Sequence, residues 1–179
     1  MNDLETESHM QHINTIHTQR LSRESYGPYG QVIDVDPSQP FKPANFGRAK
    51  RYNMLVDAKN LRPESAVLNA CIFRCSAWCE PQLELKLLER HEFSTQVFMP
   101  MEAGRYITIV ALGQDQPDLD TLAAFVMEGP QGISYHPGTW HYPMTVLDKQ
   151  LDMFCLVYED GTSGDCEIKN LASPVIVQI

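Results

Sequence analysis

Two histidines on either side of a Pro-Gly turn are the side chains of this chain best suited to chemistry. They are His136 and His141, with Pro137 and Gly138 between them. Imidazole titrates near neutral pH, so it can accept or donate a proton, and its neutral form binds metal ions. Proline fixes φ and glycine permits a tight backbone path. A single histidine would more often face water, but two beside such a turn, between apolar segments, favour a pocket with a chemical role.

A second group of polar side chains precedes this turn, on an apolar, strand-like segment. Glu89 and His91 are two residues apart, so on a strand they point to the same face, and Gln96 begins the next apolar segment. Carboxylate, imidazole and amide groups can together bind a divalent cation, or they can act directly as base, acid and hydrogen-bonding group. Amide oxygen is a weak ligand without charge, so the sequence leaves both interpretations open.

The most basic local segment has three cations within four positions, at Arg48, Lys50 and Arg51. A guanidinium presents parallel N–H groups that match the two oxygens of a carboxylate. Arg51 leads into the segment Tyr-Asn-Met-Leu-Val and could therefore point inward. The alternative is that this segment forms only a solvated, charged face.

The composition excludes several classes of partner. The chain has 179 residues, enough for one domain with a sizeable core, and a formal net charge of −9. That charge argues against nucleic acid or an anionic membrane as a partner, and no apolar run has the length of a membrane span. The N-terminus is acidic and lacks an apolar signal core, so we expect a cytoplasmic protein.

The five cysteines are expected to be free thiols. Cys71, Cys75 and Cys79 recur at every fourth position, which would place them on one face of a single strand but does not match the close spacings of iron–sulfur ligands. Packing as small apolar residues in a reducing compartment is the interpretation that we favour.

Short apolar segments separated by glycine and proline predict an all-β barrel or sandwich. Residues 1–20 are expected to be a flexible extension and residues 21–179 a single barrel domain. Segments 96–101 and 106–112 are predicted to form a hairpin, and the apolar tail 174–179 to pair with its own barrel or with a neighbouring molecule. The other predicted strands are residues 31–35, 67–73, 83–88, 123–127, 151–158 and 166–168, and residues 21–26 are predicted to form helical turns.

The two polar groups resemble the paired motifs of the cupin family. Gly138 and His141 fit the end of the second motif, and His91, Gln96 and Gly104 fit the first. The first motif departs from the pattern twice, because a glutamate replaces its first histidine and a glutamine replaces its glutamate. The resemblance implies an all-β double-stranded β-helix, the cupin-like jelly-roll barrel with minor short helices, and a ligand site at the barrel mouth.

Five further motifs lie between residues 21 and 168. They are Tyr29-Gly30-x-Val32-Ile33, Asn45-x-Gly47 with Arg51-Tyr52, the segment 88–101, the segment 110–119, and Tyr135-His136-x3-Trp140-His141-x-Pro143. Together they resemble the ureidoglycolate lyase family. The resemblance implies a carbon–nitrogen lyase of the amidine-lyase type, which cleaves ureidoglycolate to glyoxylate and urea in allantoin degradation, a part of purine metabolism. It also implies a cytoplasmic homodimer and a possible divalent metal, with nickel favoured.

This reaction needs a base for the substrate hydroxyl, a proton donor for the leaving urea nitrogen, and a cation or N–H donors for the carboxylate. On a strand Arg90 should point away from His91, so we expect it outside the pocket. The resemblance implies a catalytic set of His91, His141, His136 and Glu89. It implies a substrate-binding set of Asn45, Arg51, Tyr52, Gln96, Tyr135 and Trp140, of which the last two could equally be wall residues. The metal ligands would be His91, Gln96 and His141.

Two other classes of function remain open. A non-catalytic cupin that binds a small organic acid would present the same pocket. Another metal-dependent cupin enzyme, such as an oxygenase or a sugar isomerase, could use the same barrel. Release of urea from ureidoglycolate would separate the lyase from both, and oxygen dependence would identify the oxygenase.

Overall fold

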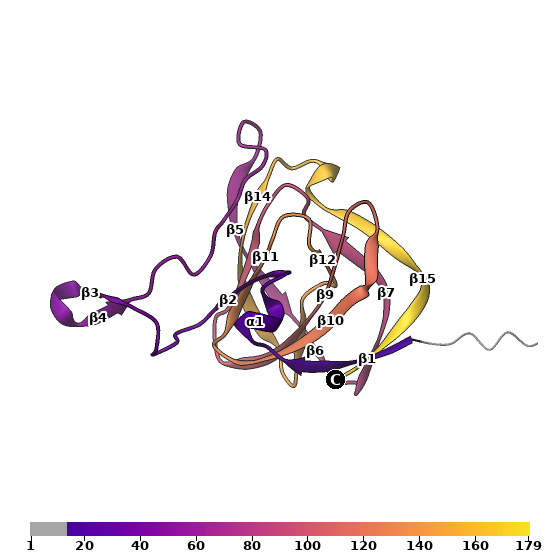
Figure 1. The fold of residues 1–179 in the computed structure, drawn as a ribbon, viewed down its shortest axis with the longest axis horizontal. Helices are drawn as coiled ribbons and strands as arrows, with labels where there is room; N and C mark the ends of the chain where they lie inside the picture. The colour runs from indigo at the N-terminus through magenta and orange to yellow at the C-terminus, as the bar shows by residue number, and fades with distance from the viewer. Residues whose placement is uncertain (1–13) are drawn as a thin grey trace, which may run out of the picture.

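Six strands close into a barrel in the computed structural model, which describes residues 14–179 (Figure 1). Their order is β10-β1-β15-β7-β12-β9, and β9 pairs back with β10. β1 is parallel to both of its neighbours, and the other pairs of the barrel are antiparallel. The bounds are β1 Asn14–Arg20, β7 Gln82–Arg90, β9 Gly104–Gly113, β10 Pro117–Gly129, β12 Trp140–His141 and β15 Glu167–Gln178.

A five-stranded antiparallel sheet packs beside this barrel, in the order β2-β11-β8-β14-β5. Its strands are β2 Gly30–Ile33, β5 Val67–Cys75, β8 Gln96–Pro100, β11 Gly132–Tyr135 and β14 Leu151–Glu159. Two short strands, β13 Thr145–Leu147 and β6 Ala77–Trp78, extend the barrel sheet beyond β9. The helical pieces are α1 Arg23–Tyr26, capped by the Ser22 side chain, and the short 3-10 helix η2 Ser163–Asp165.

Alternation along the shared strands creates two separate apolar cores. On β9, Ile109 belongs to the core inside the six-stranded barrel, while Val110 belongs to the core between the barrel and the five-stranded sheet. β12 divides in the same way, because Trp140 packs in the barrel core and His141 stacks on Tyr135 of the facing sheet. The histidine therefore lies between the two sheets.

β11, which carries Tyr135, is held closely by the segment before it. The Tyr26 hydroxyl donates to the carbonyl oxygen of Ser134 at 3.0 Å. A Cβ on Gly30 would lie 1.7 Å from that same oxygen, so only glycine allows β2 to approach β11 this closely.

A small two-stranded sheet projects from the rest of the molecule, at the left of Figure 1. We call residues 42–51 the arm. It consists of β3 Lys42–Ala44, the 3-10 turn η1 Asn45–Gly47 and β4 Ala49–Arg51. Its two strands pair only with each other, so no strand of either large sheet is hydrogen-bonded to the arm in sheet register.

The predicted all-β, cupin-like fold is confirmed, but the predicted hairpin of residues 96–112 is wrong. β8 lies in the five-stranded sheet and β9 in the barrel, because the turn between them crosses from one sheet to the other. The last strand, β15, is much longer than the predicted 166–168, and its register shifts between Asn170 and Val175. The apolar tail therefore pairs with its own barrel, through β7 and β1.

Residues 14–20, expected to be part of a flexible extension, form β1, because their backbone pairs with β10 and β15. The rest of that predicted extension lies outside the described residues. All five cysteines are free, as predicted. Within residues 14–179, no helix is both long enough and apolar enough to span a membrane.

Candidate active site

His141 on β12 is held in one tautomer. Its Nδ1 lies 2.9 Å from the carbonyl oxygen of Thr139, which can only accept, so Nδ1 carries the proton. The neutral imidazole therefore presents a lone pair at Nε2. Nε2 is buried and has no hydrogen-bond partner among the described residues. A buried polar atom without a partner costs free energy and points to a place where a ligand or ion binds.

Tyr135 of β11 fixes the plane of the His141 imidazole. The two rings are stacked, with centroids 4.0 Å apart and planes inclined by 11°. The Tyr135 hydroxyl lies 2.7 Å from Thr108 Oγ1, and both residues are buried. The Tyr135 hydroxyl is therefore paired inside the core, and its ring positions the imidazole of His141.

His91 and Gln96 join His141 from two other segments. His91 follows the end of β7, and its ring centroid lies 5.7 Å from that of His141. The Gly138 N–H donates to the carbonyl oxygen of His91 at 2.9 Å, which ties the Pro-Gly turn to the first motif. His91 Nδ1 and Gln96 Oε1 are also buried without a hydrogen-bond partner in the described part of the chain. Unpartnered polar atoms thus occur on all three residues predicted as metal ligands.

Glu89 faces His141 across the pairing of β7 with β12. Its Oε1 lies 3.6 Å from His141 Nε2. An ionised carboxylate and an imidazole lone pair are both acceptors, so this approach is favourable only with a proton or a cation between them. Burial raises the pKa of Glu89, and the Cys166 thiol, which donates to Oε2 at 3.8 Å, opposes that rise.

Burial keeps both imidazoles neutral. Burial, together with the neighbouring His91, lowers the pKa of His141 from 6.5 to about 3, and the hydrogen bond to Thr139 opposes the change. Burial also lowers the pKa of His91, and it is opposed by the hydrogen bond that the imidazole donates to the backbone of Asp165 and by the charges of Glu159 and Asp165. Neutral imidazoles can ligate a metal or accept a hydrogen bond, whereas imidazolium ions cannot.

This burial predicts that metal-free protein loses stability in acid. The unfolded chain takes up a proton at His141 near pH 6.5, whereas the folded protein does so only near pH 3. Stability therefore falls as pH decreases through this window, by up to about 1.4 kcal/mol per pH unit from this group. Urea unfolding of chelator-treated protein between pH 7 and 4 should show a steeper loss than the His141→Asn variant, which cannot titrate there. Equal slopes would contradict a neutral, buried His141.

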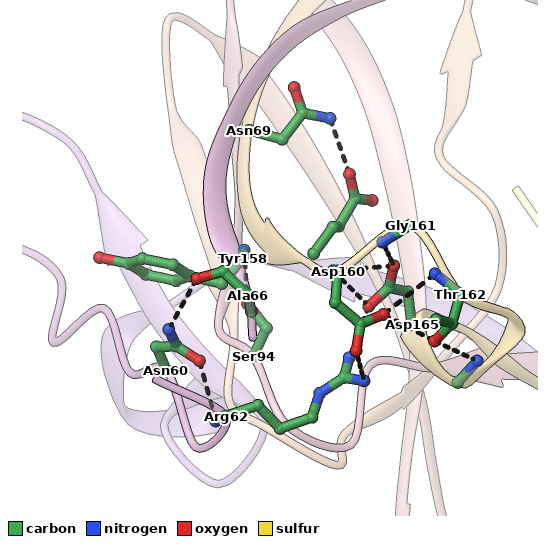
Figure 2. Close-up of polar contacts among 12 residues, drawn as sticks. Asn60, Arg62, Ala66, Asn69, Ser94, Tyr158, Asp160, Gly161, Thr162 and Asp165 are labelled. Atoms are coloured by element: carbon green, nitrogen blue, oxygen red, sulfur yellow. Dashed lines mark hydrogen bonds and ion pairs between the residues drawn. The ribbon is translucent and has the colours of Figure 1, made fainter. Parts of the chain in front are cut away.

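The loop between β14 and β15 carries a carboxylate, Asp165, whose charge acts on His91. Figure 2 shows Asp160 and Asp165 of this loop beside Arg62. Arg62 holds the loop, with Nη1 2.7 Å from Asp160 Oδ2 and Nη2 2.5 Å from Asp165 Oδ1. Asp165 also accepts from the backbone N–H of Gly161 at 2.8 Å. The loop is therefore ordered by hydrogen bonds to its own carboxylates. The guanidinium of Arg62, which Figure 2 shows beside them, donates to Asp160 and Asp165.

Two predicted site residues lie away from the His91–His141 pair. His136 lines a separate surface pocket with Arg23 and Tyr52, and its Nε2 is 3.3 Å from the carbonyl oxygen of Gly27. Trp140 points into the barrel core, because it precedes His141 on a strand and so takes the opposite face. Its indole donates to the carbonyl oxygen of Gln114 at 3.2 Å.

Arg90 points away from the histidines as expected, but it is buried. Its guanidinium stacks on Trp140, 4.6 Å from the ring centroid, and pairs with Glu167 at 2.7 Å. Its positive charge is therefore neutralised by Glu167, so Arg90 is not free to bind the carboxylate of a substrate.

The three predicted carboxylate-binding residues are not brought to the histidines within one molecule. Asn45 and Arg51 belong to the arm, and Tyr52 follows it and packs its ring 6.0 Å from that of Phe41. Arg51 is exposed and lines a shallow pocket with Lys42 and Tyr52.

Several residues that shape the site carried no local signal in the sequence. Thr139 sets the His141 tautomer through its carbonyl oxygen, a role that any residue type could fill. Cys166 reaches Glu89 from 77 positions away. The spacing of cysteines in the sequence pointed only to packing, so this contact required the fold.

The donor set fits a divalent cation only with the amide included. Among residues 14–179, no three His, Cys, Asp or Glu side chains are placed to hold a metal together. His91 Nδ1, His141 Nε2 and Gln96 Oε1 are nevertheless all buried and unpartnered, and two imidazoles with an oxygen suit zinc, nickel or iron. The neutral amide makes this a weaker site than one with a carboxylate ligand.

Comparisons with known proteins agree with this architecture. The model of the family described as "Ureidoglycolate lyase" matches residues 13–178, a wider range than the motifs alone indicated. A protein of Pseudomonas fluorescens named ureidoglycolate lyase is 35% identical over 155 residues, covering 87% of this chain and 90% of that protein. A protein of the same name from Escherichia coli is 35% identical over 151 residues, covering 84% of this chain and 91% of that protein. The chain therefore belongs to the ureidoglycolate lyase family.

Proposed function

We propose that this protein cleaves ureidoglycolate to glyoxylate and urea, as a step of allantoin degradation. Family membership over residues 13–178 supports this reaction. The observation that carries it is the set of three buried, unpartnered polar atoms on His91, Gln96 and His141, beside the carboxyl of Glu89. A purely structural core would satisfy these atoms, so they indicate a site built for a polar ligand.

The reacting carbon of this substrate bears a hydroxyl, a carboxylate and a urea nitrogen. Cleavage moves the hydroxyl proton to the urea nitrogen while the C–N bond breaks and the C=O bond forms. We assign the proton transfer to Glu89, because its carboxyl lies at the site and burial brings its pKa closer to neutrality. The lone pairs of neutral His141 and His91 set the position of the hydroxyl, by accepting its proton in a hydrogen bond or by holding a cation beside it, and the closed packing of Tyr135 excludes water behind them.

We further propose that His91, Gln96 and His141 hold a divalent cation, with nickel as the first candidate. When bound, the cation supplies positive charge beside the substrate oxygens and removes the repulsion between Glu89 and His141 Nε2. The three unpartnered donor atoms support this assignment.

Chelation tests the function and the metal together. Purified protein should release glyoxylate and urea in equal amounts, and dialysis against a chelator should lower turnover at least about tenfold, with nickel restoring it. Metal content measured before and after dialysis gives a readout independent of activity. Unchanged turnover in metal-free protein would reject the cation while keeping the lyase, and binding of ureidoglycolate without urea release would favour a non-catalytic cupin.

The proposal also covers the cellular compartment and the oligomeric state. The five free thiols suit a reducing compartment, which supports action in the cytoplasm. We also propose a homodimer, for which the surface of the five-stranded sheet and the arm supply the physical reasons set out next.

A further inference from the structure

The cations without an ion-pair partner are concentrated on the arm. The chain has 14 lysines and arginines, all within the described residues. Nine of them form an ion pair with a described carboxylate. The five that pair with no described residue are Arg20, Lys42, Arg48, Lys50 and Arg51, and the last four belong to the arm.

The arm also exposes large apolar side chains. Phe46 at its tip is fully exposed, and Met54 just beyond the arm is 94% exposed. Phe46 adopts φ 57°, a left-handed conformation that is costly for a bulky residue. An exposed aromatic in such a conformation, beside four cations that pair with no described carboxylate, is typical of a contact surface.

The outer face of the five-stranded sheet is a second unpartnered apolar surface. In an antiparallel sheet the residues that alternate with a buried face are normally polar. Here most of the alternating residues are apolar over three neighbouring strands, with the Arg74–Asp152 ion pair at one end, and we call the apolar set the apolar sheet face. It comprises Leu68 and Ile72 on β5, Phe154 and Leu156 on β14, and Val97 and Met99 on β8.

The surroundings of His91 have the opposite charge to the arm. The carboxylates there are Glu89, Glu159, Asp160 and Asp165. Arg62 pairs with two of them, so the local charge stays negative. The substrate of the proposed function is itself a carboxylate, and the described residues around His91 offer it no free guanidinium or ammonium group, because Arg62 and Arg90 are both paired with carboxylates.

Resting on that proposed function, we propose that two copies of this chain pair through their apolar sheet faces and that the arm of each copy completes the active site of the other. Arg51 then binds the substrate carboxylate with its guanidinium, and Asn45 adds an amide. Charge complementarity selects a second copy as the occupant, because the same chain carries both the basic arm and the acidic site.

The available surface is adequate for such a dimer. The five strands together have 31 residues, which at about 3.4 Å per residue and about 4.8 Å between strands span roughly 500 Å². The arm adds exposed area toward the roughly 800 Å² per partner of a standard interface. The tip residue Phe46 would be buried at the edge of that contact.

Mixing two inactive variants tests whether Arg51 acts across the dimer. Arg51→Ala should lower kcat/KM about ten- to a hundredfold, whereas the neighbouring control Arg48→Ala should change it less than about threefold. His141→Asn has an intact arm but a defective site. Co-refolded one to one with Arg51→Ala, it should restore activity to about a quarter of all sites, because only a mixed dimer joins an intact arm to an intact site.

The outcomes are distinct. Wild-type protein that releases urea while the mixture stays inactive would overturn the inference and leave the proposed function standing. Wild-type protein without urea release would reject the function, and sedimentation then tests the pairing by itself. Wild type should sediment as a dimer, and Ile72→Asp and Phe46→Asp, both at exposed positions, should shift it toward monomer. A wild-type monomer at micromolar concentration would overturn the proposed pairing.

Discussion

His141→Asn should lower turnover by about 10²–10⁴-fold, the range for loss of a group that acts on the reacting proton or holds its ligand. The substitution removes the free Nε2, which is buried and unpartnered, and keeps a polar side chain of smaller volume. Steady-state release of glyoxylate and urea measures the loss. Asparagine cannot reproduce the imidazole stack on Tyr135, so kcat should fall more than KM rises.

His136→Asn is the matched control for this result. Both histidines flank the same turn, but His136 lies in a separate surface pocket, where its Nε2 is 3.3 Å from the carbonyl oxygen of Gly27. Its replacement should change turnover less than about fivefold, within the range of a residue that makes no transition-state contact. A larger loss for His136 than for His141 would show that the chemistry occurs in that outer pocket.

Stability has to be measured beside activity. An exposed site would tolerate the loss of His141, but the structure buries this residue to 2% exposure. His141→Ala should therefore cost about 1–3 kcal/mol, whereas the asparagine variant leaves a smaller cavity. Urea unfolding of both variants separates loss of folding from loss of chemistry.

Local motifs were sufficient to predict which residues lie together when the signal is contained in a short segment. The Pro-Gly turn located His141, and the alternation of Glu89 with His91 located the opposite wall, because both signals lie within a few residues. The same alternation explains the position of Trp140. It precedes His141 on β12, so its side chain lies on the opposite face of the strand and packs in the barrel core.

Predictions failed where a neighbouring segment changes sheets. A short turn between two apolar segments normally predicts a hairpin. Between β8 and β9 the chain instead crosses from the five-stranded sheet to the barrel, and only the packing of both sheets decides this. The interrupted pattern around Pro174 similarly hid the length of β15, because the register shift that accommodates it depends on pairing with β7.

The arm shows a third limit of sequence reasoning. The family resemblance implied that Arg51 binds the substrate carboxylate, and the structure leaves this residue on an exposed hairpin. An arginine has the right side chain to bind a carboxylate, but the fold sets its distance from His91 and His141. Under our proposal, a second copy of the chain brings Arg51 to them.

Glu89→Gln should lower kcat by about 10²–10⁴-fold while leaving the fold intact. Glutamine keeps the shape of the side chain and its contact distance to Cys166, but it cannot take the hydroxyl proton. Because the change removes a carboxyl whose ionisation burial opposes, stability should be unchanged or slightly increased. Glu92→Gln, an exposed carboxyl three positions further along the chain, is the matched control and should retain nearly full activity.

The pH profile identifies the base independently of the size of this loss. Burial raises the pKa of Glu89 above 4.5, so wild-type kcat/KM should fall in acid as this carboxylate becomes protonated. His91 is the competing candidate, and burial lowers its pKa below 6.5. The acid limb should disappear from the residual activity of Glu89→Gln and persist in His91→Asn. If the limb instead disappears with His91, the proton passes through the imidazole, and Glu89 serves only to balance the charge beside His141.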